Sequence, residues 1–421
     1  MIDRLRRDDL VAHGAVVFAG AIAANAGNYL YYMLAGRVVG VEQYGELTAL
    51  ASAVLALGAP ASVAQIVIAR VAADLHARGD GAAADALLRR VTAWGGFAFA
   101  VLGAIAIACA EPVARYLQLS SGLPVVASAV ALAGYGLATV QRGVLQGTHR
   151  FGSLSASYSL ESGVRVALGI WLATRFGALG ALAGFALAEL ASVAFHGWVF
   201  RRALRPGPPA AFDRAGLTAI VSGVGAIQLT LAVLVSSYDV VIVRHVFDPA
   251  TAGLYAAASL AGRIVPGVLG FIPTVLMPKV AARAHARRSA ARLLGAALAA
   301  GGATAAGALL IAIVAPGTVA ALIAGPAFRP AAGIVPIYVA ASGFLGLATV
   351  VAAYQIGLHR YAFVVPGVVV GAAEIAAIAL WHPGITAVAW LLAAGHAALF
   401  AVTFIGIGAT AKDDRAAPAD R

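Results

Sequence analysis

The sequence predicts an all-α protein that crosses a membrane many times, with about twelve transmembrane helices in two parallel six-helix repeats. Of its 421 residues, 62% are hydrophobic and only 11% are charged, whereas soluble proteins carry about 25% charged residues. Apolar stretches of about 20 residues, the length that crosses a hydrocarbon core of about 30 Å, recur along the whole chain. Motifs that return at one fixed offset predict the repeat.

The predicted spans follow one another through short connections. The longest polar stretch between them, residues 70–90, reads as a short amphipathic surface helix and a turn. The first span is too long for the apolar core of a signal peptide, so we expect it to stay as an anchor. The twelve spans are expected near residues 12–36, 47–69, 91–110, 124–146, 153–173, 177–200, 215–243, 252–276, 293–314, 331–357, 362–381 and 385–408.

Two pairs of matching segments indicate a duplication. RVAADLHAR at residues 70–78 returns as KVAARAHAR at residues 279–287, with six identities and one Arg/Lys exchange at an offset of 209. GLATV at residues 136–140 returns at residues 346–350, and a Gly-x-His-Arg-aromatic segment follows each copy at an offset of 210. His is scarce in this chain, so agreement at its positions in one register favours a repeat over chance.

Duplication of a six-span unit fixes the relation between the halves. An even number of crossings returns the chain to the same side, so residues 1–205 and 215–421 are expected to be parallel repeats. Residues 206–214, rich in Pro and polar groups, are expected to form a cytoplasmic linker between them.

Basic residues indicate the orientation, because short cytoplasmic loops retain Lys and Arg. With both termini in the cytoplasm, most basic residues fall inside. The net charge of +11 follows from this bias and suits anionic lipid at the inner surface, so we expect no nucleic-acid partner. The single Cys109 allows neither an internal disulfide nor a Cys-based metal site, and no metal is expected. The basic residues expected outside are Arg37, Arg115, Arg175, Arg244 and Arg329.

Catalytic motifs are missing from the sequence. It contains no HExxH, GxSxG, GxxxxGK[ST] or DxD pattern, so we expect no enzyme. A membrane glycan polymerase or ligase stays as an alternative from another functional class. Such a protein would be expected to carry a large extracytoplasmic loop, and the external segments here are short.

Polar residues inside the spans fall on single helix faces. Each central Arg or Asp costs roughly 2.5–3.5 kcal/mol on insertion scales, so polar side chains are expected to face a bundle interior or water. Their spacing is i, i+3, i+7 in the first span and i, i+4, i+8 in the eighth, and one amide lies in the second. The candidate substrate-binding residues are Asn25, Asn28, Tyr32, Gln65, Tyr255, Ser259 and Arg263.

Three segments resemble the oligosaccharide flippases of bacterial polysaccharide biosynthesis, in the multidrug/oligosaccharidyl-lipid/polysaccharide exporter superfamily. They are VGVEQYGELTAL (residues 39–50), LQGTHRF (145–151) and YDVVIVRHVFDPATAGLYAAASLAGR (238–263). The resemblance implies a bundle like that of the multidrug-and-toxin extruders (MATE), with a central cavity walled by spans 1, 2, 7 and 8. It also implies export of a polyprenyl-pyrophosphate-linked oligosaccharide across the bacterial inner membrane by alternating access.

The resemblance implies partners as well. These are a lipid-linked glycan, membrane lipids and the polysaccharide polymerase machinery, with the transporter itself a monomer. A multidrug/cation antiporter of the same superfamily stays as the alternative among transporters, because Glu189, Asp239 and Glu374 are acidic residues within spans.

Arg263 has two interpretations. It lies midway along its span, and a guanidinium group matches phosphate oxygens bidentately, so it could receive the pyrophosphate in the cavity. It could instead neutralise Asp239 in a salt bridge.

The other ionisable residues in the spans suggest coupling or pairing. Relatives can hold a sodium ion or proton in the C-terminal half, and Asp239 and Glu374 resemble that arrangement, with Thr403 nearby. Glu161 and Arg165 are four residues apart and favour an intrahelical pair. Arg142 is expected to reach the lipid headgroups at the cytoplasmic end of its span. His196 and His396 are expected to be core residues.

Overall fold

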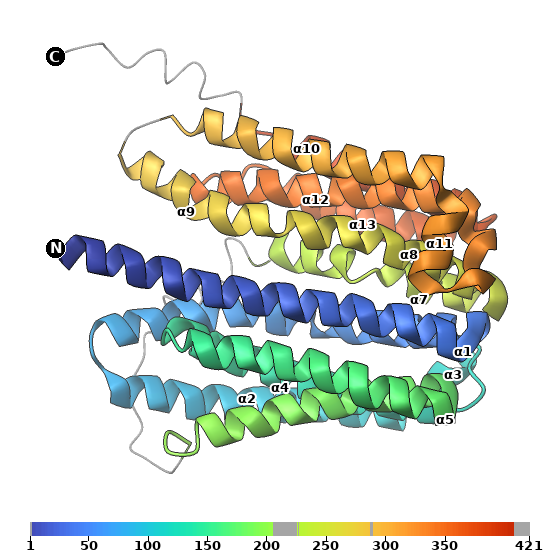
Figure 1. Ribbon diagram of the computed structural model, residues 1–421, viewed down its shortest axis with the longest axis horizontal. Coiled ribbons are helices and arrows are strands. Elements are labelled where there is room, and N and C mark those ends of the chain that lie inside the picture. Colours follow the sequence, from blue (N-terminus) through green and yellow to red (C-terminus); the bar gives the residue numbers. More distant parts are fainter. Residues whose placement is uncertain (1, 205–224, 226, 287–288, 408–421) are drawn as a thin grey trace. The chain divides into compact units, whose positions relative to one another are not determined.

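The computed structural model describes residues 2–204, 225, 227–286 and 289–407, and these residues form helices without any strand (Figure 1). The chain divides into two compact units, Met1–Val221 and Ser222–Arg421. The expected linker at residues 206–214 lies outside the described residues. The all-helical class predicted from the sequence is therefore confirmed.

The first unit is built around one buried helix. α4 packs against α1, α2 and α5, and most of its residues are buried. Small and aliphatic side chains such as Ala131, Leu132 and Leu145 are almost completely buried along it. The helices of this unit are α1 (Ile2–Ala77), α2 (Gly81–Ala108), α3 (Ala110–Tyr116), α4 (Leu123–Gly147) and α5 (Phe151–Val199).

Glycines bend the two longest helices of this unit. A straight helix of 76 residues, the length of α1, would extend about 114 Å, far beyond a hydrocarbon core of about 30 Å. Gly40 in α1 (φ 77°) and Gly177 in α5 (φ 59°) adopt positive φ values, which glycine accepts at little cost. The Gln43 side chain, just after the first bend, accepts a hydrogen bond of 3.1 Å from the Ala178 N–H, just after the second. One hydrogen bond therefore ties the two bends together.

The second unit repeats this plan around α12. That helix packs against α8, α9, α10 and α14, and its residues are mostly buried. A bent pair, Ile227–Val235 and α7, precedes α8, and the two parts meet at 53°. The helices are α7 (Tyr238–Val246), α8 (Pro249–Leu269), α9 (Phe271–His285), α10 (Ala291–Val314), α11 (Pro316–Ala324), the 3₁₀ helix η1 (Pro326–Gly333), α12 (Val335–Gly357), α13 (Val364–Leu380) and α14 (Ile385–Val402).

Eight helices of the described part are long and apolar enough to cross a membrane, or nine if the bent pair counts as one span. α1 and α5 count once each here although each bends at a glycine, and α13 is apolar but shorter. The chain is thus a multi-pass membrane protein, and the number twelve stays a prediction.

The duplication is visible in the backbone where α4 and α12 end. His149 and His359, which are 210 residues apart, both adopt left-handed φ values, 56° and 55°. After α4, the Arg150 N–H donates to the Leu145 carbonyl at 2.9 Å. After α12, the Arg360 N–H donates to the Gln355 carbonyl at 3.0 Å. Both ends are Schellman motifs, so the repeated Gly-x-His-Arg segment encodes the same helix termination twice.

The same segments also make equivalent helix contacts. A Cβ atom on Gly147 of α4 would collide with the Ala69 carbonyl and the Ala72 side chain of α1. A Cβ atom on Gly357 of α12 would press against Val280 of α9. Glycine therefore permits close helix approach at matching places in both units.

Gly147→Ala should destabilise the protein by about 1–3 kcal/mol, because the added methyl group overpacks a backbone contact. Gly152→Ala, five residues further along the chain, is the control because nothing lies within 4 Å of its position. Thermal unfolding of both variants in detergent measures the effect. A Gly147→Ala variant as stable as Gly152→Ala would contradict the close approach.

Candidate functional site: a buried polar cluster in each half

Four charged side chains form a buried network in the first unit, here called the arginine–glutamate cluster: Arg142, Glu161, Arg165 and Glu189. Glu161 bridges the two arginines, with one carboxylate oxygen 2.5 Å from Arg142 and the other 2.5 Å from Arg165. Arg165 also contacts Glu189 at 2.6 Å. Two positive and two negative groups make the cluster neutral, which permits four charges to be buried together.

Neutral partners complete the arginine–glutamate cluster. Arg142 donates to Ser157 at 3.1 Å and to Ser192 at 2.8 Å, while Arg165 donates to Asn28 at 2.7 Å. The faces of the guanidinium groups are covered by aromatic rings, because Arg142 lies 4.3 Å from the Tyr158 ring centre. The equivalent distance from Arg165 to the Phe185 ring is 4.0 Å. Rings contacting the guanidinium faces add cation–π attraction.

Helical spacing brings these residues to one place. On the first segment of α5, Ser157, Glu161 and Arg165 recur every four residues and share one face. On the second segment, after the Gly177 bend, Glu189 and Ser192 face the same centre. The cluster therefore ties both segments of α5 to α4 and α1.

In the second unit, Asp239 is held by two tyrosines. The hydroxyl groups of Tyr255 and Tyr338 donate to its Oδ2 atom at 2.8 and 2.7 Å. The two rings meet edge to face with centroids 5.5 Å apart. The carboxylate is only 1% exposed, so these neutral donors supply much of the stabilisation that water would give it.

Glu374 of α13 contacts His396 of α14 and Tyr238 of α7. The Tyr238 hydroxyl donates to its Oε1 atom at 2.8 Å, and His396 Nε2 lies 3.3 Å from the same oxygen. His396 Nδ1 lies 3.0 Å from the Ala341 carbonyl, which only accepts, so Nδ1 carries a proton. Glu374 and His396 therefore form a buried pair, here called the Glu374–His396 pair.

The candidate substrate-binding residues of the first unit have unequal access. Asn25 is exposed, Gln65 is half-buried and Tyr32 is buried. Asn28 belongs to the arginine–glutamate cluster through its bond to Arg165. Gln65 donates to Gln146 at 3.3 Å, so its amide is partly engaged within the unit.

Those of the second unit lie along α8. Tyr255 and Ser259 are completely buried, and Arg263 is half-buried. The Tyr255 hydroxyl group donates its hydrogen bond to Asp239. Thr403 donates its hydroxyl group to the Phe400 carbonyl at 2.6 Å, and its own carbonyl accepts from Gln355 at 2.7 Å.

One expectation about a single residue is wrong. Arg142 does not reach toward lipid headgroups, because it is only 2% exposed and bound to Glu161. His396 is a buried core residue as expected, and it also contacts Glu374. The pairing of Glu161 with Arg165 is confirmed, although Glu161 also forms a salt bridge with Arg142.

The polar contacts of His196, which was expected only to be a core residue, could have been predicted from the sequence. His196 hydrogen-bonds Ser157 at 2.8 Å and Gln141 at 3.1 Å. Glu189, Ser192 and His196 are spaced i, i+3, i+7, the signature of one helix face. This pattern would have predicted a second polar face opposite that of Ser157.

A bent helical bundle with neutralised charges in its interior defines the class: a multi-pass membrane protein with the architecture of a transporter. Residues 85–332 match the model of the family described as polysaccharide biosynthesis protein, more than half of the chain. The chain belongs to this family. No curated protein matches the sequence significantly.

Solved structures with the same fold are transporters. An inward-facing multidrug resistance MATE family transporter of the MOP superfamily superposes with a TM-score of 0.77 at 12% identity, covering 96% of this chain and 99% of that one. The lipid II flippase MurJ in an inward closed conformation gives 0.70 at 11% identity, covering 94% and 87%. A MATE protein in a bent conformation gives 0.63 at 13% identity, covering 96% and 97%. The MATE-like bundle is thereby confirmed.

Glu161→Gln should destabilise the protein by about 3–5 kcal/mol, because two buried guanidinium groups would then share one carboxylate. Glu42→Gln, at an exposed position of α1, is the matched control. Thermal unfolding in detergent, followed by tryptophan fluorescence, compares the two variants. Equal melting temperatures would show that the arginine–glutamate cluster does not depend on Glu161.

Proposed function

We propose that this protein moves a polyprenyl-pyrophosphate-linked oligosaccharide across the bacterial inner membrane by alternating access. The observation that carries the proposal is the family match over residues 85–332, on a fold that a lipid II flippase also has. Proteins of polysaccharide biosynthesis need such a step, because glycans assembled on a lipid carrier inside the cell must reach the outside.

The physical task is the passage of a polar headgroup through a layer without water. Sugars and phosphates lose their hydrogen bonds in hydrocarbon, at a cost of several kcal/mol for each unsatisfied group. A helical bundle supplies a polar route, while the polyprenyl chain stays in lipid. No hydrolysis is required for export, because a membrane potential of 100 mV favours outward movement of each negative charge by about 2.3 kcal/mol.

The proposed orientation places both termini in the cytoplasm of a bacterial cell. It rests on the alternation of basic and charge-poor loops, the property that orients helical membrane proteins during insertion. The headgroup would then first meet the cytoplasmic loops, which hold most of the basic residues.

For the substrate contact we favour Arg263. The Arg263 residue is half-buried on α8, whereas Tyr255 and Ser259 on the same face are completely buried. Asp239 already receives two hydrogen bonds from tyrosines, so its stabilisation does not depend on Arg263 alone. Asn25 and Gln65 are the amides with accessible surface that could bind sugar hydroxyl groups. Tyr255 and Ser259 would then support α8 from behind.

For coupling we favour a proton at the Glu374–His396 pair over a sodium ion. The groups facing this site are Tyr238 from α7, Glu374 from α13 and His396 from α14. Within the described residues, no group of three or more His, Cys, Asp or Glu side chains is suited to hold a metal ion. Sodium prefers several oxygen ligands, whereas an imidazole beside a carboxyl group holds a proton well.

Arg263→Ala and Arg263→Glu should abolish export, while Arg263→Lys should retain part of it, because the charge remains and the bidentate fork is lost. Accumulation of the lipid-linked glycan at the inner leaflet, together with the amount of surface glycan, measures export in cells.

The double variant Arg263→Ala with Asp239→Asn separates the two interpretations of Arg263. If the arginine only neutralised Asp239, removal of both charges would restore export. Normal surface glycan with Arg263→Ala, or full rescue by the double variant, would exclude Arg263 as the phosphate contact. Loss of drug efflux with unchanged glycan would instead favour the antiporter.

Glu374→Gln should abolish proton-dependent transport without lowering the amount of protein in the membrane, since it removes the acid of the Glu374–His396 pair. Transport in vesicles with an imposed pH or sodium gradient measures the dependence, with Glu42→Gln as the control. Unchanged ion dependence would leave the Glu374 carboxyl group with a structural role, and a response to sodium alone would contradict the proton.

A further inference from the structure

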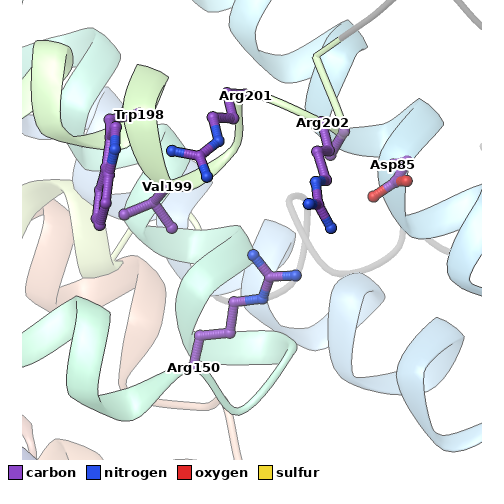
Figure 2. Close-up of a pocket in the computed structure, with 7 residues that line it drawn as sticks. Asp85, Arg150, Trp198, Val199, Arg201 and Arg202 are labelled. Carbon is purple, nitrogen blue, oxygen red and sulfur yellow. The ribbon is translucent and has the colours of Figure 1, made fainter.

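A basic pocket of about 320 Å³ opens at one end of the first unit (Figure 2). Its volume is at the lower end of the range for small-molecule sites, about 300–1,000 Å³. Figure 2 shows three guanidinium groups around it, with one carboxylate at its edge. Its lining residues are Asp85, Arg150, Trp198, Val199, Arg201, Arg202 and Ala203.

The course of α5 builds the pocket. That helix begins after Arg150, bends at Gly177 and ends at Val199, so its beginning and its end return to the same side of the unit. The turn that follows is fixed to α2, because Arg89 donates to the Ala203 carbonyl at 3.0 Å. Arg150 is thereby brought together with Arg201 and Arg202, which lie about 50 residues later in the sequence.

The charges of the pocket are not balanced by protein groups. Arg150, Arg201 and Arg202 form no salt bridge with any acid in the described part of the chain. Arg150 and Arg201 instead lie over aromatic rings, at 5.7 and 5.5 Å from the ring centres. Three positive groups with the single carboxylate of Asp85 leave a net positive pocket, which favours an anion with at least two negative oxygens.

Trp198 indicates the depth of the pocket in the membrane. Its indole ring is 63% exposed in the last turn of α5, and exposed tryptophans concentrate at the boundary between hydrocarbon and water. Arg201 follows three residues later, in the turn after α5, and basic residues beside such a tryptophan favour contact with lipid phosphates. Guanidinium groups bind phosphate oxygens in pairs, and Asp85 can accept a hydrogen bond from a headgroup hydroxyl.

We propose that this pocket binds the phosphate of an anionic phospholipid whose headgroup carries a hydroxyl group, as phosphatidylglycerol does. The site lies wholly within the first unit and does not depend on which molecule is transported. Bound lipid would offset part of the net positive charge and hold the end of α5 at the membrane surface.

Arg201→Gln with Arg202→Gln tests the pocket in the full-length protein. The affinity for phosphatidylglycerol, measured by titration of delipidated protein and native mass spectrometry, should fall roughly tenfold to thirtyfold. Arg70→Gln with Arg78→Gln is the matched control, since it removes two exposed charges elsewhere in this unit. The control should change the affinity less than about twofold. Equal loss in both double variants would reduce the effect to net charge and overturn the site.

Two further measurements test whether the pocket selects an anionic lipid. Brominated phosphatidylglycerol should quench the fluorescence difference between wild type and Trp198→Phe, while brominated phosphatidylcholine should not. This quenching measurement uses protein with all three arginines intact, so it remains valid even if the double variant fails to fold. Soluble pyrophosphate should not displace the bound lipid at matched concentration. Displacement, or quenching by both lipids alike, would show that the pocket is not selective for an anionic lipid.

Discussion

The structure depends on one constraint: hydrocarbon offers no hydrogen bonds, so each unit must satisfy its own buried polar groups. The two units meet the constraint in different ways. In the first, Glu161 shares its carboxylate between Arg142 and Arg165, and charge cancels charge. In the second, Asp239 is held by tyrosine hydroxyl groups. A charge-balanced network is costly to change, whereas a carboxylate among neutral donors can gain a proton without leaving an unpaired arginine.

The two units therefore share helix ends and glycine contacts but not their buried polar residues. The helix ends at His149 and His359, 210 residues apart, adopt the same conformation. At the offset of 210, however, the positions matching Arg142, Glu161 and Arg165 hold Ala352, Gly371 and Ile375. Glycine contacts and helix terminations keep the bundle in shape, so the interior of each half was free to acquire its own chemistry.

Sequence patterns predicted what depends on one helix at a time. Apolar length gave the all-helical, multi-pass class, and spacing along one face gave the pair Glu161–Arg165. What failed depends on a neighbouring helix. Arg142 lies near the end of its predicted span, where contact with headgroups is the cheaper expectation, and only the packing of α4 against α5 supplies Glu161. The contact of His396 with Glu374 could not be predicted either, because Glu374 lies on another helix, α13. Polar contacts between helices carry no spacing signal in one sequence.

The asymmetry between the halves also bears on how transport would gain direction. A transporter that alternates between two states needs a group whose charge differs between them, since a ligand shifts an equilibrium only by binding one state better. The charged groups of the arginine–glutamate cluster bind one another within the first unit, so the cluster is suited to stay constant. The second unit instead buries the Glu374 carboxyl group beside the His396 imidazole, at 3.3 Å, and a buried negative charge is costly. We infer that the second half is where protonation would change the energy of the bundle, while the first half supplies the rigid frame.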